Sequence, residues 1–300
     1  VTLLLSAIIT PPDVFSQIIL KGGTGDDFVI ESGATIRFDC GSTDPEDALR
    51  FRLDEQTTGN IDGTLIFQRS NSGSGPRHEL VALDANSIDI SGTILANELR
   101  SGWEPFGESG SPGSVIFQSG AVYDGSEGGS PFGDSGQPAQ VIFNPGSTYI
   151  HRGNHSFQTG GRTYANFEYR NPEINPQTLL FGSNNIWTVE DLRILDGNLV
   201  LSGGSNNLGF NINISGDFEV GIDGVFNYEP VGPLPGSAST FNFNGSLPQT
   251  ISVDATLVFN DRVTLELNNT YNSTGFALEI QDDLELFNDL LIADGEVQGA

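Results

Sequence analysis

The sequence predicts an all-β chain folded as a parallel β-helix, or β-solenoid, of short repeats. Three observations indicate this fold: a repeat of 26 residues, short segments in which apolar and polar side chains alternate, and turn pairs such as Asn-Gly and Asp-Gly between those segments. Alternating segments form strands with one buried face, and the turn pairs supply the corners of a coil. Because each coil buries its inner face only against neighbouring coils, we expect an elongated stack.

The clearest repeat lies in the middle of the chain. When residues 102–123 are aligned with residues 128–149, 12 of 22 positions are identical, and both copies contain the run Val-Ile-Phe followed by a Gly and a Tyr. A looser likeness relates Gly209–Val220 to Gly275–Leu286, 66 residues further on. Asp-Gly pairs between short apolar runs begin at Asp196, Asp223 and Asp294. These recurrences predict that the whole chain is built from one kind of unit.

An array of β-sandwich domains is the alternative all-β architecture. Sandwich domains also use short strands and frequent turns, but they repeat at about 100 residues, whereas the repeats in this chain are 26 and 66 residues apart. Helix is conceivable only within Pro45–Glu55, where Phe51 and Leu53 also fit the inward positions of a strand. The spacing therefore favours the solenoid.

The repeats divide residues 1–300, a single solenoid, into three parts. Residues 1–100 form a less regular N-terminal part, residues 101–170 carry the 26-residue repeats with Gly/Ser-rich loops, and residues 171–300 carry the C-terminal repeats. The sequence contains no methionine and stops inside a repeat. We therefore expect it to be a fragment of a longer chain.

The charge balance excludes several classes of partner. The chain has 39 acidic and 12 basic side chains, which gives a formal net charge of −27 at pH 7. Phosphate backbones and anionic membrane surfaces repel such a chain, so we expect no nucleic-acid partner. No apolar segment is long enough to span a bilayer, so we also expect no membrane insertion. Cys40 is the single cysteine, which rules out an intramolecular disulfide.

One short motif suggests a metal. Gly22–Ile30 fits the nonapeptide G-G-x-G-x-D-x-U-x of calcium-binding β-rolls, with Asp27 as the carboxylate ligand and Val29 as the inward apolar residue. A single copy offers only half of a site, and the competing interpretation is a Gly-rich turn that enters a strand. Calcium is the one possible cofactor, and Asp27 is its candidate ligand.

The histidines give little support for a second metal site. His151 and His155 are four residues apart, a spacing that brings two ligands together only on a helix. Gly153 and the surrounding repeats instead predict a turn. His78 has no second histidine or cysteine nearby and is expected at the surface.

We identify no catalytic residues and predict that the chain is not an enzyme. Solenoid enzymes that cleave polysaccharides need carboxylates contributed by successive coils, and no such set recurs in the sequence. Three arginines lie close to two tyrosines, which suggests an irregular insertion or a patch that contacts sugars; they are Arg152, Arg162, Arg170, Tyr164 and Tyr169. The alternative function is therefore a carbohydrate-active β-helix enzyme or a tailspike-like polysaccharide depolymerase.

A resemblance to a known group rests on several runs of sequence. They are Phe241–Ile251, Gly160–Phe167, Val189–Leu201, and the paired runs VIFQSGAVY and VIFNPGSTY. In these runs the chain resembles the large repetitive β-helical surface proteins that gliding and biofilm-forming bacteria export through the type IX pathway. That resemblance implies an adhesin or a cell-surface filament.

The fold and the resemblance together predict the setting and the partners. We expect a structural or adhesive segment of a secreted bacterial protein, located outside the cell or on its surface. Exposed ends of a solenoid are strand edges that recruit further strands. The expected partners are therefore a surface polysaccharide, or neighbouring subunits at the solenoid ends.

Overall fold

A computed structural model describes a large part of the chain. The described residues are 16–21, 28–38, 49–54, 58–68, 78–82, 87–97, 105–106, 113–126, 130–132, 140–153, 157–159, 161–172, 177–180, 186–202, 211–229, 239–259, 263–271, 275–281, 290–294 and 297–299. Within these ranges the chain is all-β, without helix, and its registered strand pairs are parallel. The parallel strands are stacked as a β-solenoid, which confirms the predicted fold class. The sandwich alternative is wrong, because sandwiches pair their strands antiparallel.

The chain divides into two compact units. Unit 1 comprises residues 1–116 and 126–141, and unit 2 comprises residues 117–125 and 142–300. The chain passes between the units at three points: within β10 (Ser114–Phe117), after Gly125, and within β12 (Gln140–Phe143). No helix in the described part of the chain is long and apolar enough to cross a membrane.

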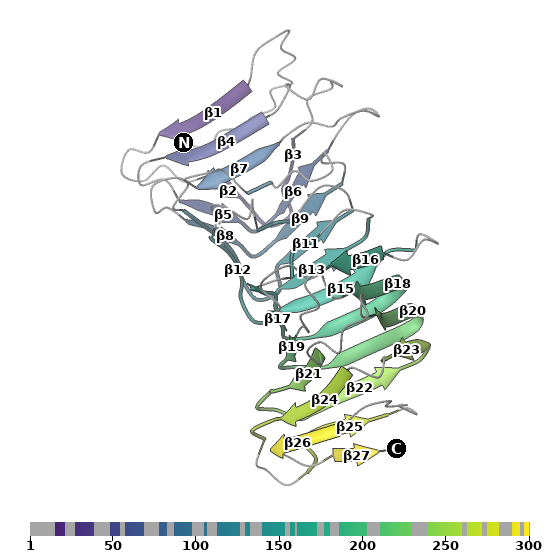
Figure 1. The fold of residues 1–300 in the computed structure, drawn as a ribbon. Helices are drawn as coiled ribbons and strands as arrows, with labels where there is room; N and C mark the ends of the chain where they lie inside the picture. Colours follow the sequence, from purple (N-terminus) through teal and green to yellow (C-terminus); the bar gives the residue numbers. More distant parts are fainter. Residues whose placement is uncertain are drawn as a thin grey trace. The chain divides into compact units, whose positions relative to one another are not determined.

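Unit 1 contains three parallel ladders (Figure 1). The first is formed by β1 (Ser16–Lys21), β4 (Leu49–Asp54) and β7 (Glu79–Ala82). The second contains β2 (Phe28–Ile30), β5 (Gly59–Ile61) and β8 (Ser87–Ile90), and the third contains β3 (Thr35–Phe38), β6 (Thr64–Phe67) and β9 (Thr93–Ala96). In β4, Phe51 and Leu53 are buried, so the alternating pattern there specifies a strand and not a helix.

Unit 2 contains two parallel ladders, named here the first and the second sheet (Figure 1). The first sheet orders β11 (Val122–Gly125), β13 (Thr148–His151), β15 (Asn166–Arg170), β18 (Leu192–Ser202), β20 (Phe218–Glu229), β22 (Gln249–Val253), β25 (Leu278–Ile280) and β27 (Val297–Gly299), with β16 (Gln177–Leu180) beside β18 and β23 (Thr256–Val258) beside β20. The second sheet orders β14 (Arg162–Thr163), β17 (Ile186–Val189), β19 (Asn211–Ile214), β21 (Ser239–Phe243), β24 (Val263–Asn268) and β26 (Leu290–Asp294). From β14 onward the chain alternates between the second sheet and the first, and it adds β16 and β23 to the first sheet directly after β15 and β22.

The 26-residue repeat corresponds to aromatic stacking between coils. Tyr123 in β11 is the register partner of Tyr149 in β13, and their rings stack with centroids 5.4 Å apart and an interplanar angle of 8°. Phe117 and Phe143 stack in the same way, at 4.5 Å and 6°. All four rings are buried. The sequence repeats there because parallel pairing places equal positions of successive coils in contact.

The likeness at 66 residues does not mark equivalent positions. It aligns Ile212 with Leu278, but Ile212 lies in β19 of the second sheet and Leu278 lies in β25 of the first. Neighbouring coils in this region are offset by 29 residues at Asn213 and Asn242. An alternating pattern records which side chains face inward, but it does not record which sheet a strand joins.

Two of the three Asp-Gly pairs lie inside strands, whereas Asp294 ends β26 and Gly295 lies outside the described residues. Asp196 and Gly197 lie within β18 and are the register partners of Asp223 and Gly224 in β20. The φ angle of Gly197 is 85°, and a Cβ atom there would lie 1.6 Å from the carbonyl oxygen of Asn171. The close approach exists because the Asn171 N–H donates to the Asp196 carbonyl, 3.0 Å away. Position 197 therefore requires glycine for its φ angle and also for its contact with the preceding coil.

This dual requirement can be tested with two glycine variants. Gly120 has the same φ angle of 85°, but nothing lies within 4 Å of the position its Cβ would occupy. We expect Gly120→Ala to lower the free energy of unfolding by about 1–2 kcal/mol, the cost of a left-handed L-residue. Gly197→Ala should cost at least about 3 kcal/mol, because the backbone must also move. Urea titrations followed by circular dichroism measure both values; equal losses would contradict the contact argument.

Candidate functional site

The calcium motif falls largely outside the described residues, as do Asp27 and His155. Val29, which the β-roll interpretation places inward, is 48% exposed, whereas its neighbours Phe28 and Ile30 are buried. The prediction that Val29 faces inward is therefore wrong. Val29 faces outward, and the residues on either side of it face inward. Within the described ranges, no group of three or more His, Cys, Asp or Glu side chains could hold a metal ion.

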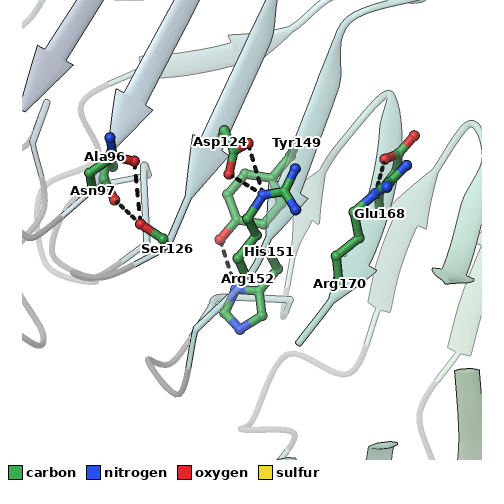
Figure 2. A network of polar contacts seen from close by, with 9 residues as sticks. All are labelled: Ala96, Asn97, Asp124, Ser126, Tyr149, His151, Arg152, Glu168 and Arg170. Atoms are coloured by element: carbon green, nitrogen blue, oxygen red, sulfur yellow. Dashed lines mark hydrogen bonds and ion pairs between the residues drawn. The ribbon is translucent and has the colours of Figure 1, made fainter. Parts of the chain in front are cut away.

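His151 belongs to the core. It is the last residue of β13 and is fully buried. Its Nδ1 lies 3.2 Å from the Tyr149 hydroxyl (Figure 2), and its Nε2 lies 2.9 Å from Oε1 of Gln177. The ring also stacks on Tyr169 at 5.6 Å. His151 is buried because it continues the inward alternation of β13. The turn expected between His151 and His155 falls largely on residues 154–156, which lie outside the described residues.

His78 is also internal, contrary to the expectation of a surface residue. Its side chain is fully buried, its Nε2 lies 3.2 Å from the Gln68 carbonyl, and its ring meets the Phe38 ring edge-on at 6.3 Å. His78 immediately precedes β7. The residues before it in the sequence are polar, so the sequence did not indicate that its side chain is buried.

The arginines and tyrosines of the expected sugar-contacting patch separate into two environments. Tyr164 and Tyr169 are buried, and their hydroxyls donate to the carbonyls of Gln158 and Asn198 at 2.7 and 3.3 Å. The arginines instead have polar side-chain partners: Arg152 pairs with Asp124, Arg170 with Glu168, and Arg162 with Gln158. A joint Arg and Tyr surface is therefore not formed.

Charged side chains occupy the outer face of the first sheet. Arg152 Nε donates to both carboxylate oxygens of Asp124 at 2.8 and 2.9 Å, and Arg170 Nε donates to Glu168 at 2.8 Å (Figure 2). The next rung adds Arg193, the register partner of Glu168.

Arg193 links carboxylates from three rungs. Its Nη2 donates to Asp191 at 2.8 Å, and its guanidinium lies 3.6 Å from a Glu168 oxygen and 3.7 Å from a Glu219 oxygen. Glu168, Arg193 and Glu219 are successive register partners. The sign of the charge therefore alternates from rung to rung, which avoids the repulsion of like charges on adjacent strands.

One carboxylate does recur at the same position of successive coils, contrary to the sequence-based expectation. Asp191 Oδ1 accepts the Asp217 N–H at 2.8 Å, and Asp217 Oδ1 accepts the Thr250 N–H at 2.8 Å. The signal was present in the sequence, because both aspartates precede an apolar-charged-apolar run. Desolvation raises the pKa of Asp217, as does the negative charge of Asp191, against the opposing effects of the Thr250 N–H and Arg193.

The outer face of the second sheet is nearly uncharged. One row of register partners consists of Thr163, Thr188, Asn213, Asn242 and Glu266. The adjacent row consists of Ile186, Asn211, Thr240 and Thr264. Asn242 Nδ2 donates to Asn213 Oδ1 at 3.1 Å, which forms an amide ladder along the first row. Hydroxyl and amide groups thus replace the ion pairs of the other sheet.

A buried polar cluster fixes the corner between the two sheets. Gln249 Nε2 donates to the carbonyls of Ile214 and Gly216 at 3.0 and 2.6 Å, and its Oε1 accepts from the Gly245 N–H at 2.9 Å. Asn269 Nδ2 donates to the same Oε1 at 2.8 Å. Because such buried amides stabilise only when their bonding groups are satisfied, this cluster sets the relation between the second sheet and the first.

Comparisons with protein families, with curated proteins and with solved structures find no match to this chain.

The raised pKa of Asp217 predicts a pH-dependent effect of Asp217→Asn. The folded state disfavours the carboxylate, so this group's contribution to stability falls as pH rises from below its ordinary pKa, 3.8, through its folded value. Asn keeps an oxygen to accept the Thr250 N–H and carries no charge. The variant should therefore gain melting temperature relative to the parent as pH rises from 3 to 7.

Thermal melts across this pH range measure the effect. Asp254→Asn is the matched control, because Asp254 is exposed and its replacement removes the same charge. A gain at Asp217 no larger than the gain at Asp254 would contradict the desolvation argument.

The amide ladder also predicts a stabilising substitution. Asn242 Oδ1 is buried and has no hydrogen-bond donor among the described residues, and its neighbour on the next rung is Glu266, which accepts but does not donate when ionised. Glu266→Gln should supply an N–H donor and raise the free energy of unfolding by about 0.5–1.5 kcal/mol. Urea titration measures the change. Glu279→Gln, at an exposed position of β25, should leave stability within about 0.5 kcal/mol.

Proposed function

We propose that this chain is a structural or adhesive segment of a secreted bacterial cell-surface protein. The observation that carries the proposal is the continuous in-register pairing of parallel strands in unit 2, with aromatic and aliphatic side chains buried along it. In such a stack each coil is held by its two neighbours, and stability grows with every interface added. Such a stack suits a scaffold, because it can hold an extended binding surface outside the cell.

The charge of the chain supports the same function. A formal charge of −27 keeps neighbouring molecules apart and in solution. On the outer face of the first sheet, Asp124, Glu168 and Asp191 form ion pairs with arginines. These pairs cover the sheet with a hydrated surface.

A carbohydrate-active β-helix enzyme is a second candidate, favoured by one observation. Asp191 and Asp217 occupy the same position of successive coils, and two carboxylates in one site are the groups that glycoside hydrolysis requires. However, Asp191 already accepts bonds from Arg193 and the Asp217 N–H, and Asp217 accepts one from the Thr250 N–H. These bonds favour a structural role for both groups.

A bead assay tests the proposed function. Beads coated with the folded chain should be retained under flow on surfaces bearing bacterial exopolysaccharide several-fold more than beads coated with the heat-unfolded chain, which has the same composition and charge. Equal retention would contradict an adhesive role for the fold.

The same protein, incubated with the polysaccharides, tests the enzyme candidate. We expect no new reducing ends or unsaturated products. Products that appear with the parent and disappear with Asp217→Asn would support the enzyme instead.

A further inference from the structure

We propose that the outer face of the second sheet in unit 2 binds a neutral, linear polysaccharide that lies along the stacked rungs. This inference rests on the proposed adhesive function and names its ligand class. The amide face, as we name this surface, consists of Thr163, Thr188, Asn213, Asn242, Glu266, Ile186, Asn211, Thr240 and Thr264.

The first argument is the distribution of charge. Glu266 is the one ionisable residue among the nine that define the amide face, in a chain whose net charge is −27. The outer face of the first sheet, in contrast, carries Asp124 and, on three successive rungs, Glu168, Arg193 and Glu219. A surface that excludes charge suits a ligand without charge, because an ionic ligand would lose hydration there and find no counter-ion.

The second argument is the hydrogen-bonding capacity of the amide face. The bond from Asn242 to Asn213 uses one N–H and one carbonyl oxygen. It leaves the Asn213 Nδ2 group without a partner among the described residues, and Asn211, on the neighbouring row, is exposed. Amides both donate and accept, as threonine hydroxyls do, and sugar hydroxyls have the same dual capacity. Ile186, 46% exposed, adds apolar surface for the C–H face of a sugar ring.

The third argument is repetition along one direction. Each row presents one side chain per rung, and parallel strands lie about 4.8 Å apart. A linear polymer along the rows therefore meets similar groups at each step and gains affinity from many weak contacts. A monosaccharide meets only one or two rungs. Binding should consequently rise steeply with chain length, which is the expected signature of this surface.

The net charge of the protein decides between polysaccharide classes. Acidic polymers such as alginate are repelled by the chain's field at low ionic strength. A neutral polymer experiences no such repulsion, so its binding should change little between low and moderate salt. The geometry and the charge therefore both point to a neutral glycan.

Affinity electrophoresis of the folded chain tests the proposal. The gels contain β-1,4-glucan, β-1,3-glucan, α-1,6-glucan or α-mannan as neutral probes, and alginate or polygalacturonate as acidic probes. We expect retardation by at least one neutral polymer and by neither acidic one. Oligosaccharides of that neutral polymer should compete better as their length increases.

Two double variants locate the binding surface. Asn211→Asp with Thr240→Asp places two carboxylates on neighbouring rungs of the amide face. Thr148→Asp with Asn166→Asp changes the same two residue types at register partners on the outer face of the first sheet. The first variant should bind about tenfold more weakly, because the carboxylates cannot donate to sugar oxygens and lose hydration when the polymer covers them, and the second should bind within about twofold of the parent. Circular dichroism melts establish that both variants are folded.

Three results would overturn the proposal: no retardation of the folded parent by any neutral polymer, retardation by the acidic polymers alone, or equal loss of binding in the two double variants. The bead assay separates this failure from failure of the proposed function. If coated beads still adhere while the amide-face variant adheres as well as the parent, the adhesive function stands and the amide face is not its ligand site. If the parent beads do not adhere, the proposed function itself fails.

Discussion

In-register parallel pairing between successive coils is the constraint on which the rest of unit 2 depends. Every side chain has its counterpart in the next coil as a near neighbour, so each position must tolerate a copy of itself or of a compatible group. In the interior, aromatic rings meet this condition by stacking, as Tyr123 does on Tyr149. At the bends, glycine meets it by the absence of a side chain, as Gly197 does against Asn171. The core and the corners therefore meet the same requirement, that groups at equal positions of successive coils fit against each other.

The outer faces meet the same requirement in two different ways. A column of identical charges would repel itself, so the first sheet alternates Glu168, Arg193 and Glu219 along one row. The second sheet uses groups that can pair with their own kind, such as the amides of Asn213 and Asn242. Asp191 and Asp217 are the exception, and each compensates by accepting a backbone N–H from the following coil. The neutrality of the amide face therefore has a structural origin, and it also suits that face to an uncharged ligand.

Some sequence-based predictions failed for an identifiable reason. Val29 was expected inward and is exposed, while His78 was expected at the surface and is buried. Both stand beside Gly- or Ser-rich stretches, where no long alternating run fixes the phase of the strand. Tyr164 and Tyr169 were grouped with neighbouring arginines by proximity in the sequence. Strand alternation in β15 instead turns Tyr169 inward and Arg170 outward, and Tyr164 is buried just after β14. Asp191 and Asp217 were missed because their contact depends on the backbone N–H groups of another coil.

The sequence alone determined that this protein is all-β and built as a parallel solenoid. Alternation within a short segment indicates a strand, turn pairs indicate corners, and the repeat indicates stacked coils. The 26-residue repeat also aligns Tyr123 with Tyr149, and the structure pairs these two residues in register. Only the tertiary structure decided which strands join which sheet, and hence that charged residues gather on one outer face and amides on the other. The physical reason is that loops of variable length separate the strands, so neighbours in space stand at offsets such as 26 and 29 residues that no single period specifies.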